Sequence, residues 1–265
     1  METDYSVRFN GFSRLVGKSA MEKIAASSVC VIGLGGVGSW AVEALARCGV
    51  GKITIVDFDE VCKSNVNRQL HALDGEFHKP KVEVMAERIR KINPLCEVTP
   101  VQLFFTYSTA ETILKPQFDY VIDAMDSPSK KCYLAHYCRE RGLNLIITGA
   151  AGGKTDPTKV RIADLSAVNH DRLLQEVRKK LRVKYNFPRL PEPMMVEAVF
   201  SEEPTRKPVI EGCEDRSKRR SLDCRTGLGT AVFVTAVFGF VAASRVVNRI
   251  AGIVTEDLSE KEKSK

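Results

Sequence analysis

The sequence predicts an α/β fold with a mostly parallel sheet that is covered by helices on both faces. Short apolar runs alternate with segments of helical periodicity between residues 28 and 149. A glycine-rich turn, Gly33-x-Gly35-x-x-Gly38, separates the first apolar run from the first helical segment. Strands that alternate with helices in this way pair in parallel through right-handed crossovers. A long uncharged segment at 226–244 predicts one further helix near the C-terminus.

The elements in the first part of the chain are bounded by residues that start or stop regular structure. The first helix follows the glycine turn and ends at Gly49, a residue type common just after a helix. Pro80 opens another helix with its apolar residues on one face, and Asn93-Pro94 stops it. The expected strands are 28–33, 52–57, 97–102, 120–126 and 144–149, and the expected helices are 38–48, 81–93, 108–115 and 129–142.

The character of the sequence changes after residue 153. Residues 154–225 hold six prolines, charge runs and little periodicity, so we expect a substrate-facing insertion or a partly mobile loop. Residues 226–244 are close to the length that spans a bilayer, but they are rich in Gly, Ala and Thr. A buried core or interface helix is therefore favoured over a membrane segment. We expect a domain at 1–153 and a basic extension at 154–265 that packs on the same domain.

Charge and cysteine content narrow the choice of partner and compartment. The net charge is +7, with 18 Lys and Arg against 17 Asp and Glu in residues 1–153 and 22 against 16 in residues 154–265. The C-terminal excess suits a polyanionic partner, although a solvated basic surface explains it equally well. The eight cysteines form no CxxC pair, and the first residues carry no apolar signal segment. We therefore expect a reducing, cytoplasmic setting and no zinc site of four thiolates.

The glycine-rich turn predicts a Rossmann-like phosphate-binding loop. After a strand, such a turn offers backbone N–H groups and the positive end of the next helix to phosphate oxygens. Asp57 ends the second expected strand, nineteen residues after Gly38. An acidic residue at this place commonly binds the ribose hydroxyls of a nucleotide. These features fit NAD and ATP equally well.

The residues beyond the ribose carboxylate favour a nucleoside triphosphate over NAD. The stretch DFDEVCKSNVNRQLH contains Asn65, Arg68 and Gln69, and Lys81 begins the next helix. Arg and Lys supply positive charge to phosphate oxygens. The segment DAMD closes a strand with Asp126, where open sheets bind ligands and where a carboxylate can hold Mg²⁺. Such a set serves adenylation, in which a substrate carboxylate attacks the α-phosphate and pyrophosphate leaves.

Together these motifs resemble the ubiquitin-activating-enzyme-like superfamily, with ThiF, MoeB and HesA as bacterial members. The stretches GLGGVGS, DFD, SNVNRQ, PKVEVMAERI and DAMD carry the resemblance from residue 8 to about residue 153. The resemblance implies ATP with Mg²⁺ on Asp126, and it implies Arg68, Lys81, Asp126 and Arg14 as catalytic residues. Arg14 would reach the ATP of a partner subunit, with Arg8 as the alternative. The implied nucleotide-binding residues are Gly33, Gly35, Gly36, Gly38, Asp57, Asp59, Asn65, Arg68, Gln69 and Lys81.

Further stretches resemble one branch of this superfamily, the bacterial tRNA threonylcarbamoyladenosine dehydratases. RFNGFSRLVG, GGKTDPTKVRIADL, VFSEEP and LDCRTGLGTAVFVTAVFGFVA extend the resemblance over nearly the whole chain. It implies adenylation of the threonyl carboxylate beside the tRNA anticodon, then ring closure to a hydantoin with net loss of water. A homodimer is implied as well, while a sulfur-transfer protein partner and a monovalent cation remain open. The alternatives are an adenylating enzyme for a ubiquitin-like sulfur carrier, a non-catalytic binding module and an NAD-dependent oxidoreductase.

Two basic segments are candidates for tRNA binding. The stretch RKKLRVKYNFPR at 178–189 combines six Lys and Arg with two aromatic residues and no acid. This mixture suits RNA, and it suits a solvated helix face as well. RSKRR at 216–220 is similar. The candidate tRNA-binding residues are Lys179, Lys180, Arg182, Lys184, Arg219 and Arg220.

Four other residues have a plain structural explanation. Cys224 and Cys62 could act as nucleophiles, but adenylation followed by intramolecular cyclisation requires no cysteine. We therefore expect both to be buried, unreactive thiols. His71 and Asp123 are expected to be structural, with Asp123 as a capping or core-edge residue.

Overall fold

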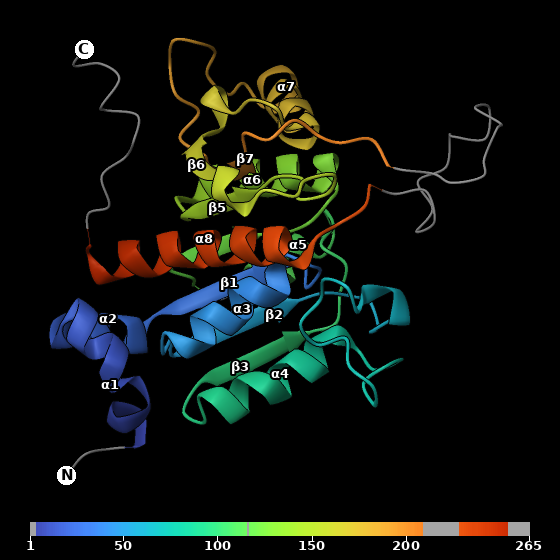
Figure 1. The fold of residues 1–265 in the computed structure, drawn as a ribbon. Coiled ribbons are helices and arrows are strands. Elements are labelled where there is room, and N and C mark those ends of the chain that lie inside the picture. Colours follow the sequence, from blue (N-terminus) through green and yellow to red (C-terminus); the bar gives the residue numbers. More distant parts are fainter. Residues whose placement is uncertain (1–3, 116, 209–227, 254–265) are drawn as a thin grey trace.

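The computed structural model describes residues 4–115, 117–208 and 228–253, and a seven-stranded sheet lies at its centre (Figure 1). The strands are β1 (Ser28–Ile32), β2 (Lys52–Val56), β3 (Glu97–Val101), β4 (Tyr120–Asp123), β5 (Leu145–Thr148), β6 (Val160–Asp164) and β7 (Glu197–Ser201). They follow the order β3-β2-β1-β4-β5-β7-β6, and only β6 and β7 pair antiparallel. The order reverses between β1 and β4, and open sheets bind ligands at the carboxyl ends of strands at such a point.

Helices cover both faces of the sheet (Figure 1). They are α1 (Asp4–Val16), α2 (Lys18–Ala26), α3 (Gly38–Arg47), α4 (Lys81–Ile92), α5 (Ala110–Ile113), α6 (Pro128–Arg141), α7 (Arg172–Lys184) and α8 (Val232–Ala251), with the short turns η1 (Lys63–Asn65), η2 (Pro157–Lys159) and η3 (Leu165–Ala167). Successive side chains of a strand point to opposite faces. Val29 and Val31 accordingly pack in the core beneath α3, α4 and α8, while Cys30 and Ile32 pack in the core beneath α6 and α7.

The structure confirms the predicted α/β architecture and the elements expected between residues 28 and 149. One boundary differs in a way that affects the site. The strand expected at 120–126 ends at Asp123, so Asp126 lies in the loop before α6. Two helices before the first strand were not predicted. They are α1 and α2, which precede the first strand and pack against each other.

The segment after residue 153 is more regular than its composition indicates. Within the described residues up to 208, it forms β6, α7 and β7, and both strands extend the main sheet. Leu174, Val177 and Leu181 are buried on one face of α7. Their spacing is helical, but the many charges between them obscured the pattern. The expectation of a loop was therefore wrong for this part of the segment.

Residues 232–244 of the long apolar segment lie in α8, which continues to Ala251 and is the one described helix that is long and apolar enough to cross a membrane. It packs along α3, and Gly239 lies so close to the Val37 carbonyl oxygen that a Cβ would approach it to 2.5 Å. Such a close crossing requires small residues, which explains the Gly and Ala content. Near the C-terminal end of α8, Arg245 is 7% exposed and pairs with Glu197 of β7 at 3.3 Å. These contacts support the interpretation of α8 as a core helix.

Candidate functional site

The glycine turn between β1 and α3 is closely fitted to the strand ends around it. Gly33 has φ +94°, and a Cβ there would lie 2.9 Å from the Ala124 carbonyl oxygen. A Cβ on Gly38 would collide with the carbonyl oxygen of Gly33. By contrast, no atom lies within 4 Å of the place where a Cβ of Gly35 would stand. The turn is thus packed against protein on one side and open at Gly35.

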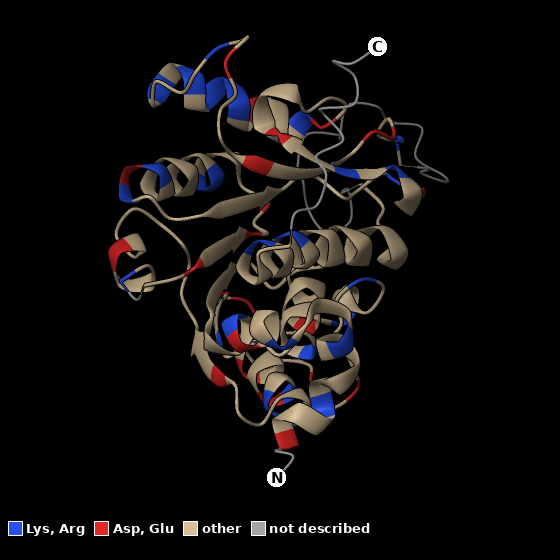
Figure 2. Ribbon diagram, turned by 90° about the vertical axis from the view of Figure 1, so that its left-hand side faces the viewer, with Lys and Arg blue, Asp and Glu red and all other residues tan. Residues whose placement is uncertain are grey.

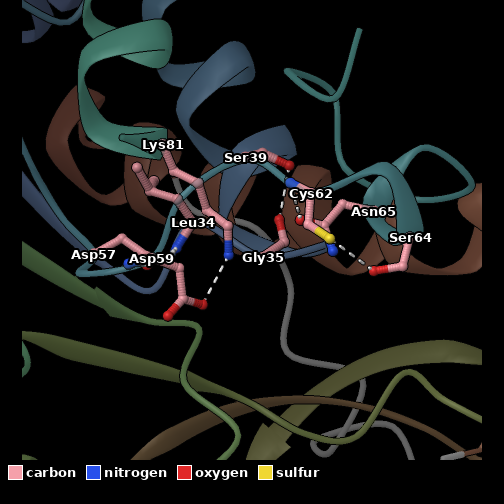
Figure 3. A network of polar contacts seen from close by, with 9 residues as sticks. All are labelled: Leu34, Gly35, Ser39, Asp57, Asp59, Cys62, Ser64, Asn65 and Lys81. Carbon is pink, nitrogen blue, oxygen red and sulfur yellow. Dashed lines mark hydrogen bonds and ion pairs between the residues drawn. The ribbon is translucent and has the colours of Figure 1, made fainter. Parts of the chain in front are cut away.

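The open side of the turn presents backbone donors. Within the described residues, the N–H groups of Gly35, Gly36 and Val37 have no backbone acceptor. These donors lie next to the N-terminus of α3, where the helix dipole favours negative charge. The hydroxyl of Ser39 donates to the Gly35 carbonyl oxygen at 2.8 Å and holds the turn in shape (Figure 3). An anion such as a phosphate fits a loop of this kind without further protein groups.

Asp57 ties the glycine turn to the end of β2. Its Oδ2 accepts a hydrogen bond from the Leu34 N–H at 2.6 Å, and its Oδ1 accepts one from the Asp59 N–H at 2.8 Å (Figure 3). Each carboxylate oxygen can accept more than one hydrogen bond, so the side chain can also accept from hydroxyls of a ligand. The sequence suggested that Asp57 binds a ligand. Its hydrogen bond to the Leu34 N–H, which fixes the turn, is visible only in the structure.

Lys81 and Asp59 form an ion pair beside the turn. Lys81 is the first residue of α4, and its Nζ lies 2.9 Å from Asp59 Oδ2 (Figure 3). The Lys81 side chain is only 6% exposed, whereas the Asp59 side chain is 59% exposed. The ammonium group is therefore held in place by a carboxylate that remains accessible to solvent. Both residues were predicted for the nucleotide site, but their pairing with each other was not.

The segment from Asn65 to Gln69 lies beside the turn at Gly36. The side chain of Arg68 covers Gly36, whose added Cβ would lie 3.1 Å from the Arg68 Cγ atom. The Arg68 guanidinium donates to the Ser64 carbonyl oxygen and to the Asn67 Oδ1 atom, both at 2.8 Å. Asn65 accepts a hydrogen bond from the Cys62 N–H at 3.1 Å. Gln69 is buried, and its Oε1 has no hydrogen-bond partner among the described residues.

The two aspartates near the end of β4 have different environments. Asp123 is fully buried and pairs with Lys131 of α6 at 3.1 Å, and burial raises the pKa of its carboxyl. Asp126 lies in the loop after the strand and is exposed. Asp123 therefore has a structural role of the kind expected from the sequence. Asp126 is the carboxylate that a metal ion in solvent can reach.

A group of buried charges at the ends of β4, β5 and β7 was not predicted. Lys154 is 2% exposed and donates to the Glu203 carbonyl oxygen at 2.5 Å, and burial lowers its pKa. Asp171 is fully buried and accepts from the N–H groups of Ala150 at 2.8 Å and Leu174 at 3.0 Å. Ala150 and Asp171 are 21 positions apart in the sequence, and Lys154 and Glu203 are 49 positions apart. No local pattern in the sequence could have revealed them.

The basic residues of α7 fall into two groups, those bound to other parts of the protein and those exposed to solvent. Arg178 donates to the carbonyl oxygens of Leu165, Ser166 and Val168, and Arg182 donates to that of Pro188. Lys180 pairs with Glu176 at 2.7 Å. Lys179 and Lys184 are exposed, and Figure 2 shows the concentration of Lys and Arg on this uppermost helix. The other basic segment, with Arg219 and Arg220, and Cys224 lie outside the described residues.

The arginines predicted to reach a partner subunit lie away from the glycine turn of their own chain, and one prediction, for Cys62, is corrected by the structure. Arg14 and Arg8 lie on α1, whose Tyr5 hydroxyl donates to the Gly49 carbonyl oxygen just beyond the C-terminus of α3. The glycine turn is at the other end of α3, so neither arginine joins the site of its own chain. Cys62 was expected to be buried but is exposed. The pKa of the Cys62 thiol is lowered, mainly because its sulfur accepts a hydrogen bond from the Ser64 hydroxyl.

Comparison with known proteins gives a consistent result. The ThiF family matches residues 8–264. The tRNA threonylcarbamoyladenosine dehydratase of Haemophilus influenzae is 44% identical over 249 residues, 93% of this chain and 94% of that protein. The Escherichia coli protein of the same name is 42% identical over 92% of this chain and 93% of that protein.

A solved structure agrees with the sequence relatives. The crystal structure of Escherichia coli tRNA N6-threonylcarbamoyladenosine dehydratase, TcdA, in complex with ATP superimposes with a TM-score of 0.85 at 38% identity. The match covers all of both chains. The glycine turn, the carboxylate of β2 and the cations near it are thus found in a chain that belongs to the ThiF family.

Proposed function

We propose that this protein uses ATP to convert threonylcarbamoyladenosine beside the tRNA anticodon into its cyclic hydantoin form. The observation that carries the proposal is the open glycine turn, with Asp57 fixing its shape and with Arg68 and Lys81 beside it. The names of the relatives supply the substrate class, and the ATP in the Escherichia coli structure supplies the nucleotide. Both agree with the arrangement of phosphate-binding groups in this chain.

The reaction has two chemical steps. In the first, an oxygen of the threonyl carboxylate attacks the α-phosphorus of ATP, and pyrophosphate leaves. In the second, a nitrogen of the carbamoyl group attacks the activated carbonyl carbon, loses its proton and expels AMP. The substrate loses one water in total, because its carboxylate oxygen leaves with AMP. The first step places additional negative charge on phosphate oxygens, and preorganised donors lower its barrier.

The side chains near the turn fit these demands. Backbone N–H groups at Gly35 and Gly36 would bind phosphate oxygens, and Arg68 lies over the same part of the turn. Lys81 would exchange its contact with Asp59 for a phosphate oxygen, since both acceptors are anionic. Of the Gln69 side-chain amide, only the nitrogen can donate to a phosphate oxygen. These donors and cations would surround the anionic part of a nucleotide.

Asp126 fits a magnesium ion that is shared with the nucleotide. No cluster of three or more His, Cys, Asp or Glu that could hold a metal occurs in the described residues. Magnesium in nucleotide sites commonly needs only one or two carboxylates, since phosphate and water supply the other ligands. When bound, the ion would neutralise charge on the phosphate oxygens. The exposed Asp126 at the carboxyl edge is the residue we assign to it.

We also infer that two copies of the chain act together. Phe233 and Phe240 of α8 are 52% and 42% exposed, and Val66 near the site is 57% exposed. An apolar surface of this kind favours association. Arg14 lies away from its own glycine turn, so a second copy would be needed for it to act at a nucleotide. The measurement is sedimentation velocity of the wild type and of Phe233→Glu, which we expect to shift toward the monomer.

The exposed lysines of α7 are the described candidates for tRNA phosphates. We expect Lys179→Ala/Lys184→Ala to weaken tRNA binding and to flatten its salt dependence, by about 0.7 for each phosphate of single-stranded RNA that the variant no longer neutralises. Lys91, an exposed residue of α4, provides a control in Lys91→Ala. An unchanged salt slope in the double variant would contradict a role of α7 in binding tRNA. A tRNA substrate supports the proposal that the reaction takes place in the cytoplasm.

The central test follows pyrophosphate release. Purified protein receives ATP and Mg²⁺ with tRNA that carries threonylcarbamoyladenosine, with tRNA that lacks it, or with a sulfur-carrier protein ending in Gly-Gly. We expect release only with the modified tRNA, together with its hydantoin in nucleoside mass spectra. Release only with the sulfur carrier would reject the proposed function and favour the alternative adenylating enzyme.

A further inference from the structure

A band of solvent-accessible aromatic rings and lysines runs from the nucleotide site toward α7. It joins the carboxyl ends of β2 and β3 to the beginning of α6 and the end of α7, and we call it the aromatic strip. Its side chains come from segments that are far apart in the sequence. The strip consists of Phe58, Phe104, Tyr107, Lys130, Lys184 and Tyr185.

The first part of the strip adjoins the glycine turn. Phe58 follows Asp57 directly and stacks on Phe104, with ring centroids 4.2 Å apart and an angle of 24° between the rings. The two residues are 47% and 49% exposed. The Lys130 ammonium lies 4.8 Å from the centroid of Phe104. Two apolar rings are thus held open to solvent, with a cation beside them.

The second part of the strip extends to α7. Tyr107, in the loop before α5, is 56% exposed and lies 4.1 Å from Tyr133 of α6. Its hydroxyl lies 3.2 Å from the Tyr185 hydroxyl and accepts a hydrogen bond from Lys184 at 3.2 Å. Tyr185 in turn stacks on His136 at 4.4 Å. These contacts fix the orientation of rings that remain accessible.

The composition of the strip suits an unpaired nucleic acid better than a duplex. Single-stranded binding sites combine aromatic rings, on which bases stack, with cations that contact the backbone. A paired base has both faces covered by its neighbours and cannot stack on a protein ring. The Lys184 ammonium lies over Tyr107 and Tyr185 at 5.3 and 5.1 Å, so stacking and charge occur side by side.

We propose that the aromatic strip binds unpaired nucleotides of the tRNA substrate by stacking and leads them toward the ATP site. The proposal rests on the proposed function, because that function supplies an RNA whose target base lies in a loop. The exposed face of Tyr107 receives one base, and Lys130 and Lys184 contact the neighbouring phosphates. The strip thereby selects looped RNA over helical RNA without reading the sequence.

The test compares variants that keep or remove a ring at one position. Tyr107→Leu removes the ring, whereas Tyr107→Phe and Tyr107→Trp keep it and serve as matched controls. We expect Tyr107→Leu to raise the dissociation constant of a fluorescein-labelled anticodon stem-loop RNA about 5- to 150-fold, the range that corresponds to the loss of one base stack. The two controls should bind nearly as the wild type does, and binding of a fully paired RNA should be unaffected in all variants.

Phe104→Leu provides a second position, with ATP affinity measured alongside. It should weaken stem-loop binding and leave the dissociation constant of ATP unchanged. Equal binding of the stem-loop by the wild type, Tyr107→Leu and Phe104→Leu would overturn the proposal. It would also be overturned if the two variants bound paired RNA more weakly to the same extent as the stem-loop. If Tyr107→Leu loses stem-loop binding while the wild type releases no pyrophosphate with modified tRNA, the strip stands and the proposed function fails. If the wild type releases pyrophosphate but its RNA binding is insensitive to both changes, the proposed function stands and the strip fails.

Discussion

Replacing His71 with leucine should remove a specific loss of stability in mild acid. His71 is 1% exposed, and neither of its ring nitrogens has a hydrogen-bond partner among the described residues. Burial, followed by the positive charge of Lys81, lowers the pKa of His71 from 6.5 to about 4. The ring is therefore neutral in the folded protein down to about pH 4, whereas the unfolded chain takes up a proton below pH 6.5.

The size of the effect follows from the difference between the two pKa values. Between pH 6.5 and about pH 4, the folded state binds fewer protons at His71 than the unfolded state does. The free energy of unfolding therefore falls as the pH falls through this window, and it is unaffected by His71 above pH 6.5. At 1.36 kcal/mol per pKa unit, the total loss is about 3 kcal/mol.

Urea unfolding at a series of pH values measures this loss. The quantity to follow is the free energy of unfolding of the wild type minus that of His71→Leu. It should decrease by about 3 kcal/mol between pH 6.5 and about pH 4, whatever its value at neutral pH. His78 is exposed with φ +68°, which asparagine tolerates, so His78→Asn is a control that should follow the wild type. A difference that stays constant across the window would refute the burial of a neutral His71.

Three further predictions concern the nucleotide site. Asp126→Asn should abolish pyrophosphate release with modified tRNA and leave the melting temperature unchanged, and near-normal turnover would reject its role with Mg²⁺. Lys81→Met should lower kcat about 100- to 1,000-fold in the same assay. Asp59→Asn should lower kcat less, because the Lys81 ammonium group remains. Equal losses of kcat in the two variants would mean that the ion pair itself, and not the ammonium group, is required. Gly38→Ala should destabilise the fold, since its methyl group meets the Gly33 carbonyl oxygen, whereas Gly35→Ala should melt normally and bind ATP weakly by calorimetry. The reverse result would place the open side of the turn elsewhere.

The five parallel strands up to residue 148 could be predicted because they are short, mostly apolar and separated by clear helix signals. The strand at Ser28–Ile32 is buried on both faces, so it stands out as a continuous apolar run. The helix Arg172–Lys184 was missed because Leu174, Val177 and Leu181 are isolated among charged residues. The sequence does carry local helix signals there, the N-cap residue Asp171 and the helical spacing of the three apolar residues, but the surrounding charges masked them.

For the candidate site, the residue types were predictable and their partners were not. The spacing of the glycines and Asp57 predicted a phosphate-binding turn, and the structure has a turn that is open at Gly35 and bonded to Asp57 through Leu34. The contacts that hold the side chains in place are long-range. Lys81 meets Asp59 across 22 positions, and the Trp40 indole N–H donates to the Arg68 carbonyl oxygen across 28. Such pairings become visible only when the chain has folded.

The buried charges beside the site have a common location that bears on its chemistry. Asp123 and Lys131 hold the end of β4, and Asp171 holds the N–H of Ala150 just beyond β5. Breaking a buried ion pair by removing one partner typically costs about 3–5 kcal/mol, so the Asp123–Lys131 pair strongly favours one conformation at the end of β4. The Ala124 carbonyl oxygen, one residue after Asp123, is the atom that Gly33 packs against. The buried Asp123–Lys131 pair thereby fixes the backbone at Ala124, against which the glycine turn packs. The backbone N–H groups of the turn are therefore held in position before a ligand binds. Electrostatic stabilisation of the proposed phosphoryl transition state is most effective when donors are preorganised in this way.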